Sequence, residues 1–252
     1  NNLSTISKAV NEFANATENN LRYPWNLTAA LGDAHFGSAA NYTANSESVG
    51  HLFAVPIIKG YLGTARSLLS PCDPTREQAN DLAETGWSGY SPGGTGIPAD
   101  AISYTLVKGA DAGRAETILA TSRNLSGCDL AGAKWVGADS DPDSDAAMAG
   151  LTAGQGQLTT TDGGTRQSNN ADIGAGGLLI SAHTAARGGI SKAAATTGVI
   201  GCVGGFPDFA AVNGGKAYTG NSHWNNHNSL KNASGVNLPG NNFAFRFDGV
   251  AT

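Results

Sequence analysis

The chain has 252 residues, which is enough for one large domain or two small ones. Only 14% of its residues are charged and its net charge is −5, so it lacks the basic stripe of a nucleic-acid binder, and no nucleic-acid partner is expected. It contains no run of 18 or more apolar residues of the kind that spans a membrane. The many glycines (35) and the low charge are typical of extracellular proteins rich in strands and loops.

The first predicted element is an amphipathic helix over residues 2–18. Leu3, Ile6, Val10 and Phe13 are separated by three, four and three residues, which places them on one face of a helix. Pro24 forbids a continuation, so the helix should end before it. Because the chain opens directly on this helix without a capping residue, we expect a longer helix that begins before Asn1.

The next elements are less regular. Residues 23–50 are rich in glycine, asparagine and serine and are expected to form a loop. Residues 51–69 are predicted to be helical, with an interruption at Pro56. A short helix is expected over residues 75–85 and a glycine- and proline-rich loop over residues 86–99.

The remaining elements are predicted to be strands. Residues 102–107 and 117–121 are rich in strand-forming side chains, and residues 157–161 and 165–167 flank a glycine-containing turn. The sequence therefore predicts an α+β fold in which the N-terminal amphipathic helix packs on an antiparallel sheet, with long irregular loops rich in glycine and asparagine.

Three cysteines are present, at positions 72, 128 and 202. None lies close enough to another for a CxxC metal or redox motif. In an extracellular protein the simplest arrangement is one disulfide and one leftover thiol, and Cys72–Cys128 is the preferred pair, with Cys202 free and buried. The alternative is that all three are small buried apolar residues.

Several short motifs follow one another along residues 1–172. They are Asn1-Asn2-Leu3, Tyr23-Pro24, Ser70-Pro71-Cys72-Asp73-Pro74, Ile102-Ser103-Tyr104, Gly156-Gln157-Leu158 and Asp162-Gly163. In this order they resemble the type IV pilin-like proteins, and specifically the pseudopilin-type proteins with a prepilin-type N-terminus. The chain departs from the family pattern at Pro71-Cys72, where the family places the cysteine before the proline.

The resemblance implies a single pilin-like domain over residues 1–252. Leu3, Ile6, Val10 and Phe13 then belong to the second half of an assembly helix whose apolar first half precedes this chain and is its one link to a membrane. Residues 174–235 form either an insertion or an extra subdomain, because a second Asp-Gly closes the predicted strand Phe243–Gly249.

A candidate calcium site lies in the most acidic segment of the chain. Asp139, Asp141, Asp143 and Asp145 alternate within seven residues, and their mutual repulsion favours a hard cation with oxygen ligands. The segment is not an EF-hand, because Ala146 stands where that motif requires glycine. Major pseudopilins are known for a loop calcium site, which is the family argument for calcium here. The alternative is a solvated acidic loop.

A weaker metal hypothesis concerns His223 and His227, which are four residues apart. No glutamate follows His223, so the HExxH motif is absent. His183 is a conceivable general base, but the sequence offers it no partner. No catalytic residue is therefore assigned, and no cofactor is required apart from the candidate Ca²⁺.

The sequence thus favours a structural subunit of an extracellular or cell-surface filament, a periplasmic pseudopilus included. Its partners are then further copies of itself or other pilin-like subunits. A secreted adhesion or glycan-binding module is the alternative, with Trp25, Trp87 and Trp224 as exposed platforms for a sugar ring. A secreted metal-dependent hydrolase that uses the two histidines is the third hypothesis.

Overall fold

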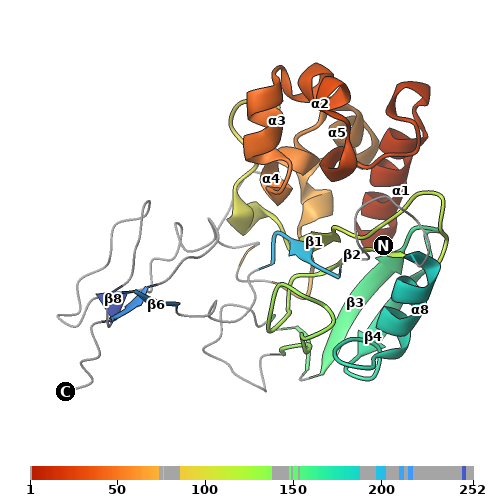
Figure 1. The fold of residues 1–252 in the computed structure, drawn as a ribbon, viewed down its shortest axis with the longest axis vertical. Helices are drawn as coiled ribbons and strands as arrows, with labels where there is room; N and C mark the ends of the chain where they lie inside the picture. The colour runs from red at the N-terminus through yellow and green to blue at the C-terminus, as the bar shows by residue number, and fades with distance from the viewer. Residues whose placement is uncertain are drawn as a thin grey trace.

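The computed structural model describes residues 2–73, 76, 86–137, 148, 150–152, 154–187 and 197–202, and the backbone of three short strands between residues 210 and 247. A five-stranded antiparallel sheet forms its centre (Figure 1). Helices α1 to α5 gather on one side of this sheet, and α8 lies against the other. The α+β class expected from the sequence is therefore observed.

All the described helices except α8 precede the first strand of the sheet. Among the described residues the longest is α1 (Asn2–Asn15), so the helix predicted over residues 2–18 is confirmed as far as residue 15. Ala16 has a non-helical backbone, and a separate 3-10 turn, η1 (Thr17–Asn19), follows it. The others are η2 (Pro24–Asn26), α2 (Ala29–Phe36), α3 (Ala39–Asn45), α4 (Val49–Phe53), α5 (Pro56–Leu62), η3 (Ala65–Leu68), η4 (Ala99–Ala101) and α8 (Leu178–Arg187). The helix expected over residues 75–85 lies outside the described residues, apart from position 76.

The loop expected over residues 23–50 is wrong, because α2 and α3 lie within it. Each helix has a hydroxyl cap: the Thr28 hydroxyl accepts the N–H of Leu31, and the Ser38 hydroxyl accepts the N–H of Asn41. Gly37 then ends α2 with φ of +78°, a conformation that glycine adopts without strain. These caps define two short helices in a segment whose composition resembles a loop.

Strands β1 to β4 and β8 lie in segments predicted to be strands, whereas β5, β6 and β7 were not predicted. The central sheet has the order β4-β3-β2-β1-β5, and every neighbouring pair is antiparallel. Its strands are β1 (Tyr104–Val107), β2 (Ile118–Ser122), β3 (Gln155–Thr160), β4 (Thr165–Asn169) and β5 (Val199–Ile200). A separate sheet contains β6 (Ala210–Val212), β7 (Gly215–Ala217) and β8 (Arg246–Phe247).

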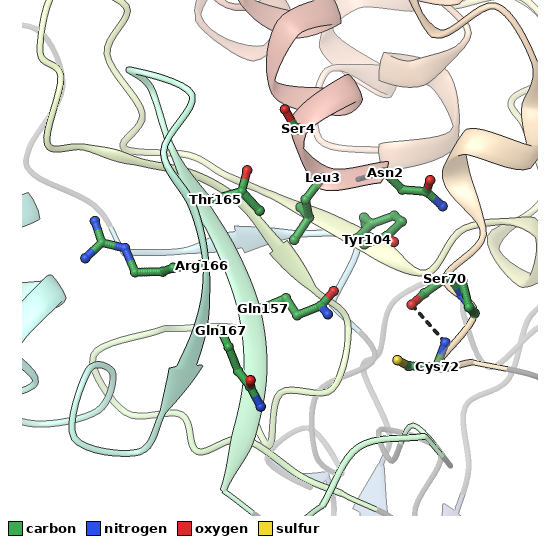
Figure 2. Close-up of a pocket in the computed structure, with 11 residues that line it drawn as sticks. Asn2, Leu3, Ser4, Ser70, Cys72, Tyr104, Gln157, Thr165, Arg166 and Gln167 are labelled. Carbon is green, nitrogen blue, oxygen red and sulfur yellow. Dashed lines mark hydrogen bonds between the residues drawn. The ribbon is translucent and has the colours of Figure 1, made fainter.

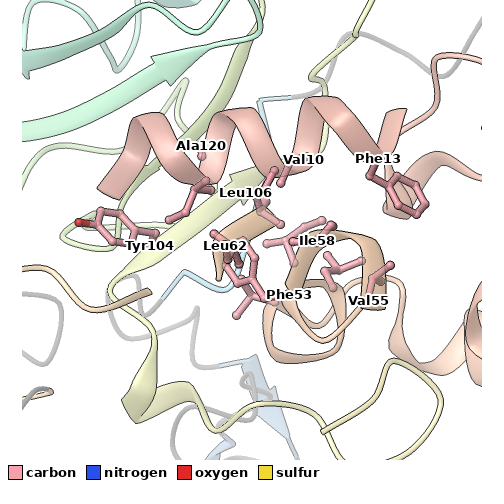
Figure 3. Close-up of a cluster of buried hydrophobic side chains, with 14 of the residues drawn as sticks. Val10, Phe13, Phe53, Val55, Ile58, Leu62, Tyr104, Leu106 and Ala120 are labelled. Atoms are coloured by element: carbon pink, nitrogen blue, oxygen red, sulfur yellow. The ribbon is translucent and has the colours of Figure 1, made fainter. Parts of the chain in front are cut away.

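Every residue of β1 and β2 is buried. Because alternate residues of a strand point to opposite faces of the sheet, both faces of these two strands are covered. Leu106 of β1 and Ile200 of β5 lie in the apolar cluster that contains α1 and α5 (Figure 3). Their neighbours Val107 and Val199 lie in a second cluster with Ile180 of α8. The sheet therefore separates two cores, of which the one beneath α1 is the larger.

Part of the segment considered as an insertion, residues 174–235, is built into this sheet. β5 pairs with β1, and α8 contributes to the second cluster. Most of residues 203–235 lie outside the described residues, so the division into a main domain and an insertion remains a prediction.

The hairpin of β3 and β4 closes through a carboxylate-centred turn, as the Asp-Gly motif predicted. The Asp162 carboxylate accepts the Thr160 hydroxyl at 2.5 Å and the Gly164 N–H at 2.9 Å. These hydrogen bonds hold the pKa of Asp162 below its ordinary value. Gly163, with φ of +85°, supplies the left-handed residue that the turn requires.

We expect Asp162→Asn to lower the melting temperature slightly at pH 7. A depressed carboxyl pKa contributes stability above the unfolded-state pKa of about 4, and that contribution disappears as the pH falls through the folded-state pKa. The difference between the two proteins should therefore shrink as the pH falls from 5 towards 2, as measured by thermal melts. A difference that stays constant over this range would contradict the role of the charge.

Candidate functional site

The apolar stripe of α1 is buried within the chain itself. Leu3 is 2% exposed, and Ile6, Val10 and Phe13 are fully buried. The helix lies between strands β2 and β3 on one side and α5 on the other (Figure 3). The predicted burial is therefore observed, and any contact of α1 with another subunit must use its opposite, polar face.

That polar face is open to solvent. Ser4, Lys8 and Asn15 are exposed, and they recur along one side of the helix at spacings of four and seven residues. We call these three residues the outer face of α1.

Two asparagines of α1 form hydrogen bonds that fix the helix to the rest of the fold. Asn11 donates to the carbonyl of Thr161 at 2.8 Å and accepts the Tyr23 hydroxyl at 2.7 Å. Near the other end of the helix, Asn2 donates to the carbonyl of Leu69 at 2.6 Å. The Tyr23-Pro24 motif therefore has a physical role, because its tyrosine folds back onto the helix that it follows.

A cleft of about 680 Å³ opens beside the first turn of α1 (Figure 2). Four separate segments line it: the start of α1, the loop after η3, β1 and the β3–β4 hairpin. The lining residues are Asn2, Leu3, Ser4, Ser70, Pro71, Cys72, Tyr104, Gln157, Thr165, Arg166 and Gln167. Most of its lining residues carry a side-chain amide or hydroxyl, groups that can form hydrogen bonds to a polar ligand or to a polypeptide backbone.

One wall of the cleft is the sheet face beyond α1. Gln157 of β3 and Gln167 of β4 are directly opposite each other across the two strands. Arg166, one position away, points its guanidinium away from Tyr104 and Cys72 (Figure 2). This follows from strand alternation, because Arg166 is paired with Leu158, which belongs to the second cluster.

The opposite wall contains a buried tyrosine and a cysteine. Burial raises the pKa of Tyr104, while hydrogen bonds with Ser70 and Asn2 lower it in part. The Cys72 N–H donates to the Ser70 hydroxyl at 3.2 Å, and the cysteine is half-buried with a free thiol. The Asp73 N–H also donates to the Ser70 carbonyl at 2.9 Å, so hydrogen bonds within the loop help to fix its conformation.

The next residue in this loop carries a buried ion pair. The Asp73 carboxylate accepts two hydrogen bonds from the Arg123 guanidinium, at 2.6 and 2.7 Å. The Asp73 and Arg123 side chains are 1% and 5% exposed, and Arg76 approaches the same carboxylate at 3.9 Å. This bidentate pair ties the loop after η3 to the residue that follows β2.

The disulfide predicted between Cys72 and Cys128 is wrong. Cys128 is bonded to Cys202, with a Cα–Cα distance of 5.5 Å, and Cys72 is the free cysteine. The reason is topological. Cys128 lies in the loop against β5, the strand that Cys202 follows, whereas Cys72 follows η3 and lines the cleft beside α1.

We expect removal of this disulfide by Cys128→Ala to lower the free energy of unfolding by about 4 kcal/mol. The bond closes a loop with a sequence separation of 74 residues, and the chain-entropy account gives that magnitude. Urea denaturation measures the loss, with Cys72→Ala as the matched control that leaves the disulfide intact. Peptide mapping without reduction should recover residues 128 and 202 in one fragment; a 72–128 fragment would contradict the observed pairing.

The other sequence hypotheses fare differently. His183 is fully buried and its Nδ1 accepts the N–H of Ile118 at 3.0 Å, which is a structural role. Trp25 is 9% exposed and stacks on Tyr23, so it is not an exposed platform for a sugar; Trp87 is partly buried. The acidic residues Asp139, Asp141, Asp143 and Asp145, and His223, Trp224 and His227, lie outside the described residues.

Within the described part of the chain, no three metal-ligating side chains of His, Cys, Asp or Glu converge, and no helix is long and apolar enough to cross a membrane.

The sequence did not predict Tyr104, Arg166 and Gln167 as cleft residues. Comparisons of the chain with family models, curated proteins and solved structures found no match.

Proposed function

We propose that this chain is a structural subunit of an extracellular or periplasmic filament of the type IV pilin-like class, which assembles with copies of itself or with other pilin-like subunits. The observation that carries the proposal is the seating of α1. The apolar residues Leu3, Ile6, Val10 and Phe13 are all buried between the sheet and α5. The helix is therefore packed firmly into the subunit and presents a polar outer face. Such a subunit needs no catalytic residue.

Two further features support the proposal. An N-terminal helix packed on an antiparallel sheet is what the motif resemblance implies, although helices α2 to α5 lie between α1 and the first strand. The Cys128–Cys202 disulfide is compatible with a secreted or extracellular location, where such bonds persist. The glycan-binding alternative gains no comparable support, because Trp25 is buried.

Cysteine cross-linking on the native host tests the proposal. In a Cys72→Ser background, which removes the free thiol, Lys8→Cys places a thiol on the outer face of α1. Because each subunit then carries one reactive thiol, mild oxidation of intact cells should produce a covalent dimer on a non-reducing gel. Ala34→Cys, on the exposed side of α2, is the matched control for random collisions at the cell surface. Monomers alone with Lys8→Cys and with the partly exposed Glu12→Cys would contradict a contact through this face.

Calcium at residues 139–145 remains a prediction. If the four aspartates bind Ca²⁺ in the native state alone, millimolar calcium should raise the melting temperature and EDTA should lower it. Asp143→Ala should abolish that difference without unfolding the protein, and Asp33→Ala on α2 is the control for a general loss of negative charge. Equal melting temperatures in calcium and in EDTA would remove the site.

A further inference from the structure

The two edges of the central sheet differ in how far other parts of the chain cover their backbone groups. At the β5 edge, the N–H of Val199 donates to the carbonyl of Cys128, and the N–H of Leu130 donates to the carbonyl of Thr197. The disulfide fixes this covering loop beside the strand. The β5 edge is therefore closed by the chain itself, which is one way in which proteins prevent unwanted strand pairing.

At the β4 edge, three residues have backbone groups that point outward. In an antiparallel pair, alternate residues bond to the neighbouring strand and the others point away. Gln157 of β3 directs its N–H to the Ser122 hydroxyl of β2, so its neighbours Gly156 and Leu158 are the β3 residues that bond to β4, through Ser168 and Arg166. The N–H and C=O groups of the intervening β4 residues, Thr165, Gln167 and Asn169, consequently point outward.

Only one of these three residues is capped in the described part of the chain. The N–H of Asn169 donates to the Asp172 carboxylate, and its carbonyl accepts the N–H of Asp172, both at 3.0 Å. The outward backbone groups of Thr165 and Gln167 have no such partner among the described residues. They border the cleft, and Arg166 lies between them with an exposed side chain.

We propose that the Thr165–Gln167 edge is a docking site for an extended strand of another polypeptide chain that carries an acidic residue opposite Arg166. The backbone groups of Thr165 and Gln167 point away from β3, and those of Arg166 between them bond to β3. This alternation is the one that an antiparallel partner strand needs for its hydrogen bonds. The partner residues opposite Thr165 and Gln167 then face the cleft. The residue opposite Arg166 lies on the other face, where a carboxylate complements the guanidinium.

Pairing of β4 with β4 of a second copy fits this edge poorly. An antiparallel pairing that uses Thr165 and Gln167 of both copies puts Arg166 opposite the same arginine of the second copy. Like charges directly opposite each other destabilise a sheet. The β5 edge of a second copy is covered by the Cys128 loop, so it offers no free strand. These constraints favour a partner of different sequence.

The test uses the full-length protein and the synthetic heptapeptide acetyl-STVDVTS-amide, with acetyl-STVKVTS-amide as the charge control. In ¹H–¹⁵N spectra, the acidic peptide should shift the amide signals of Thr165 and Gln167 and slow their hydrogen exchange. The amides of Arg166 and Ser168, which already bond to β3, serve as internal controls. The lysine peptide should bind about 3-fold more weakly, the effect of one cross-strand charge pair.

Two variants separate docking from unfolding. Arg166→Glu should reverse the preference between the two peptides. Gln167→Pro removes an N–H that points outward rather than to β3, so it should abolish binding while the melting temperature changes little. Absence of shifts at Thr165 and Gln167 in millimolar peptide would overturn the proposal, as would a charge preference that Arg166→Glu leaves unchanged. The peptide test needs no filament, so its outcome is independent of filament assembly.

Discussion

Phe13→Ala should lower the free energy of unfolding by about 3–5 kcal/mol, the range for a fully buried phenylalanine that loses its ring. The ring lies in the cluster between α1 and α5 and contacts His35, with ring centroids 4.8 Å apart. Urea denaturation measures the loss. Lys8→Ala, on the exposed side of the same helix, should change stability by less than about 0.5 kcal/mol.

The same substitution has a second readout. Burial holds the pKa of His35 below its ordinary value, and removal of the Phe13 ring admits water to the imidazole. An NMR titration should therefore show the pKa of His35 rising in Phe13→Ala. A stability loss below about 1 kcal/mol with an unchanged His35 titration would show that α1 is not seated as described.

Arg123→Ala should also be strongly destabilising, by about 3–5 kcal/mol. The substitution leaves the Asp73 carboxylate buried without its bidentate partner, and the more distant Arg76 cannot replace two hydrogen bonds. Chemical denaturation of the purified variant measures the effect.

The matched control is the more accessible ion pair of Lys108 and Glu47, which are 33% and 69% exposed, with an N–O distance of 2.7 Å. Lys108→Ala should cost no more than about 1 kcal/mol, because water solvates both charges and screens their attraction. Equal losses for Lys108→Ala and Arg123→Ala would contradict the assignment of the Asp73 pair as a structural anchor of the cleft.

Much of the fold could be predicted because its elements carry periodic patterns. The stripe on α1 has the helical period, and the central strands are short runs of strand-forming residues. Helix α8 and strand β5 were also not predicted, but the longest missed segment is residues 23–50, which lacks an apolar stripe. Its usable signals were local: Thr28 and Ser38 directly before runs of helix-forming residues, and Gly37 directly after one.

The candidate site was harder to predict, because it depends on long-range pairing. The cleft gathers residues from four segments, and sequence spacing does not reveal which segments meet. The cysteines show the same limit. Three cysteines allow three single pairings, and the choice depended on where β5 joins the sheet.

The most direct test of the filament proposal is electron microscopy of material sheared from the surface of the native host, labelled with gold-conjugated antibodies against this chain. The account predicts filaments that bind gold along their length and that disappear when the gene is deleted. Recovery of the chain as a monomer from the same cells, with no labelled filament in the sheared fraction or in the periplasm, would contradict it.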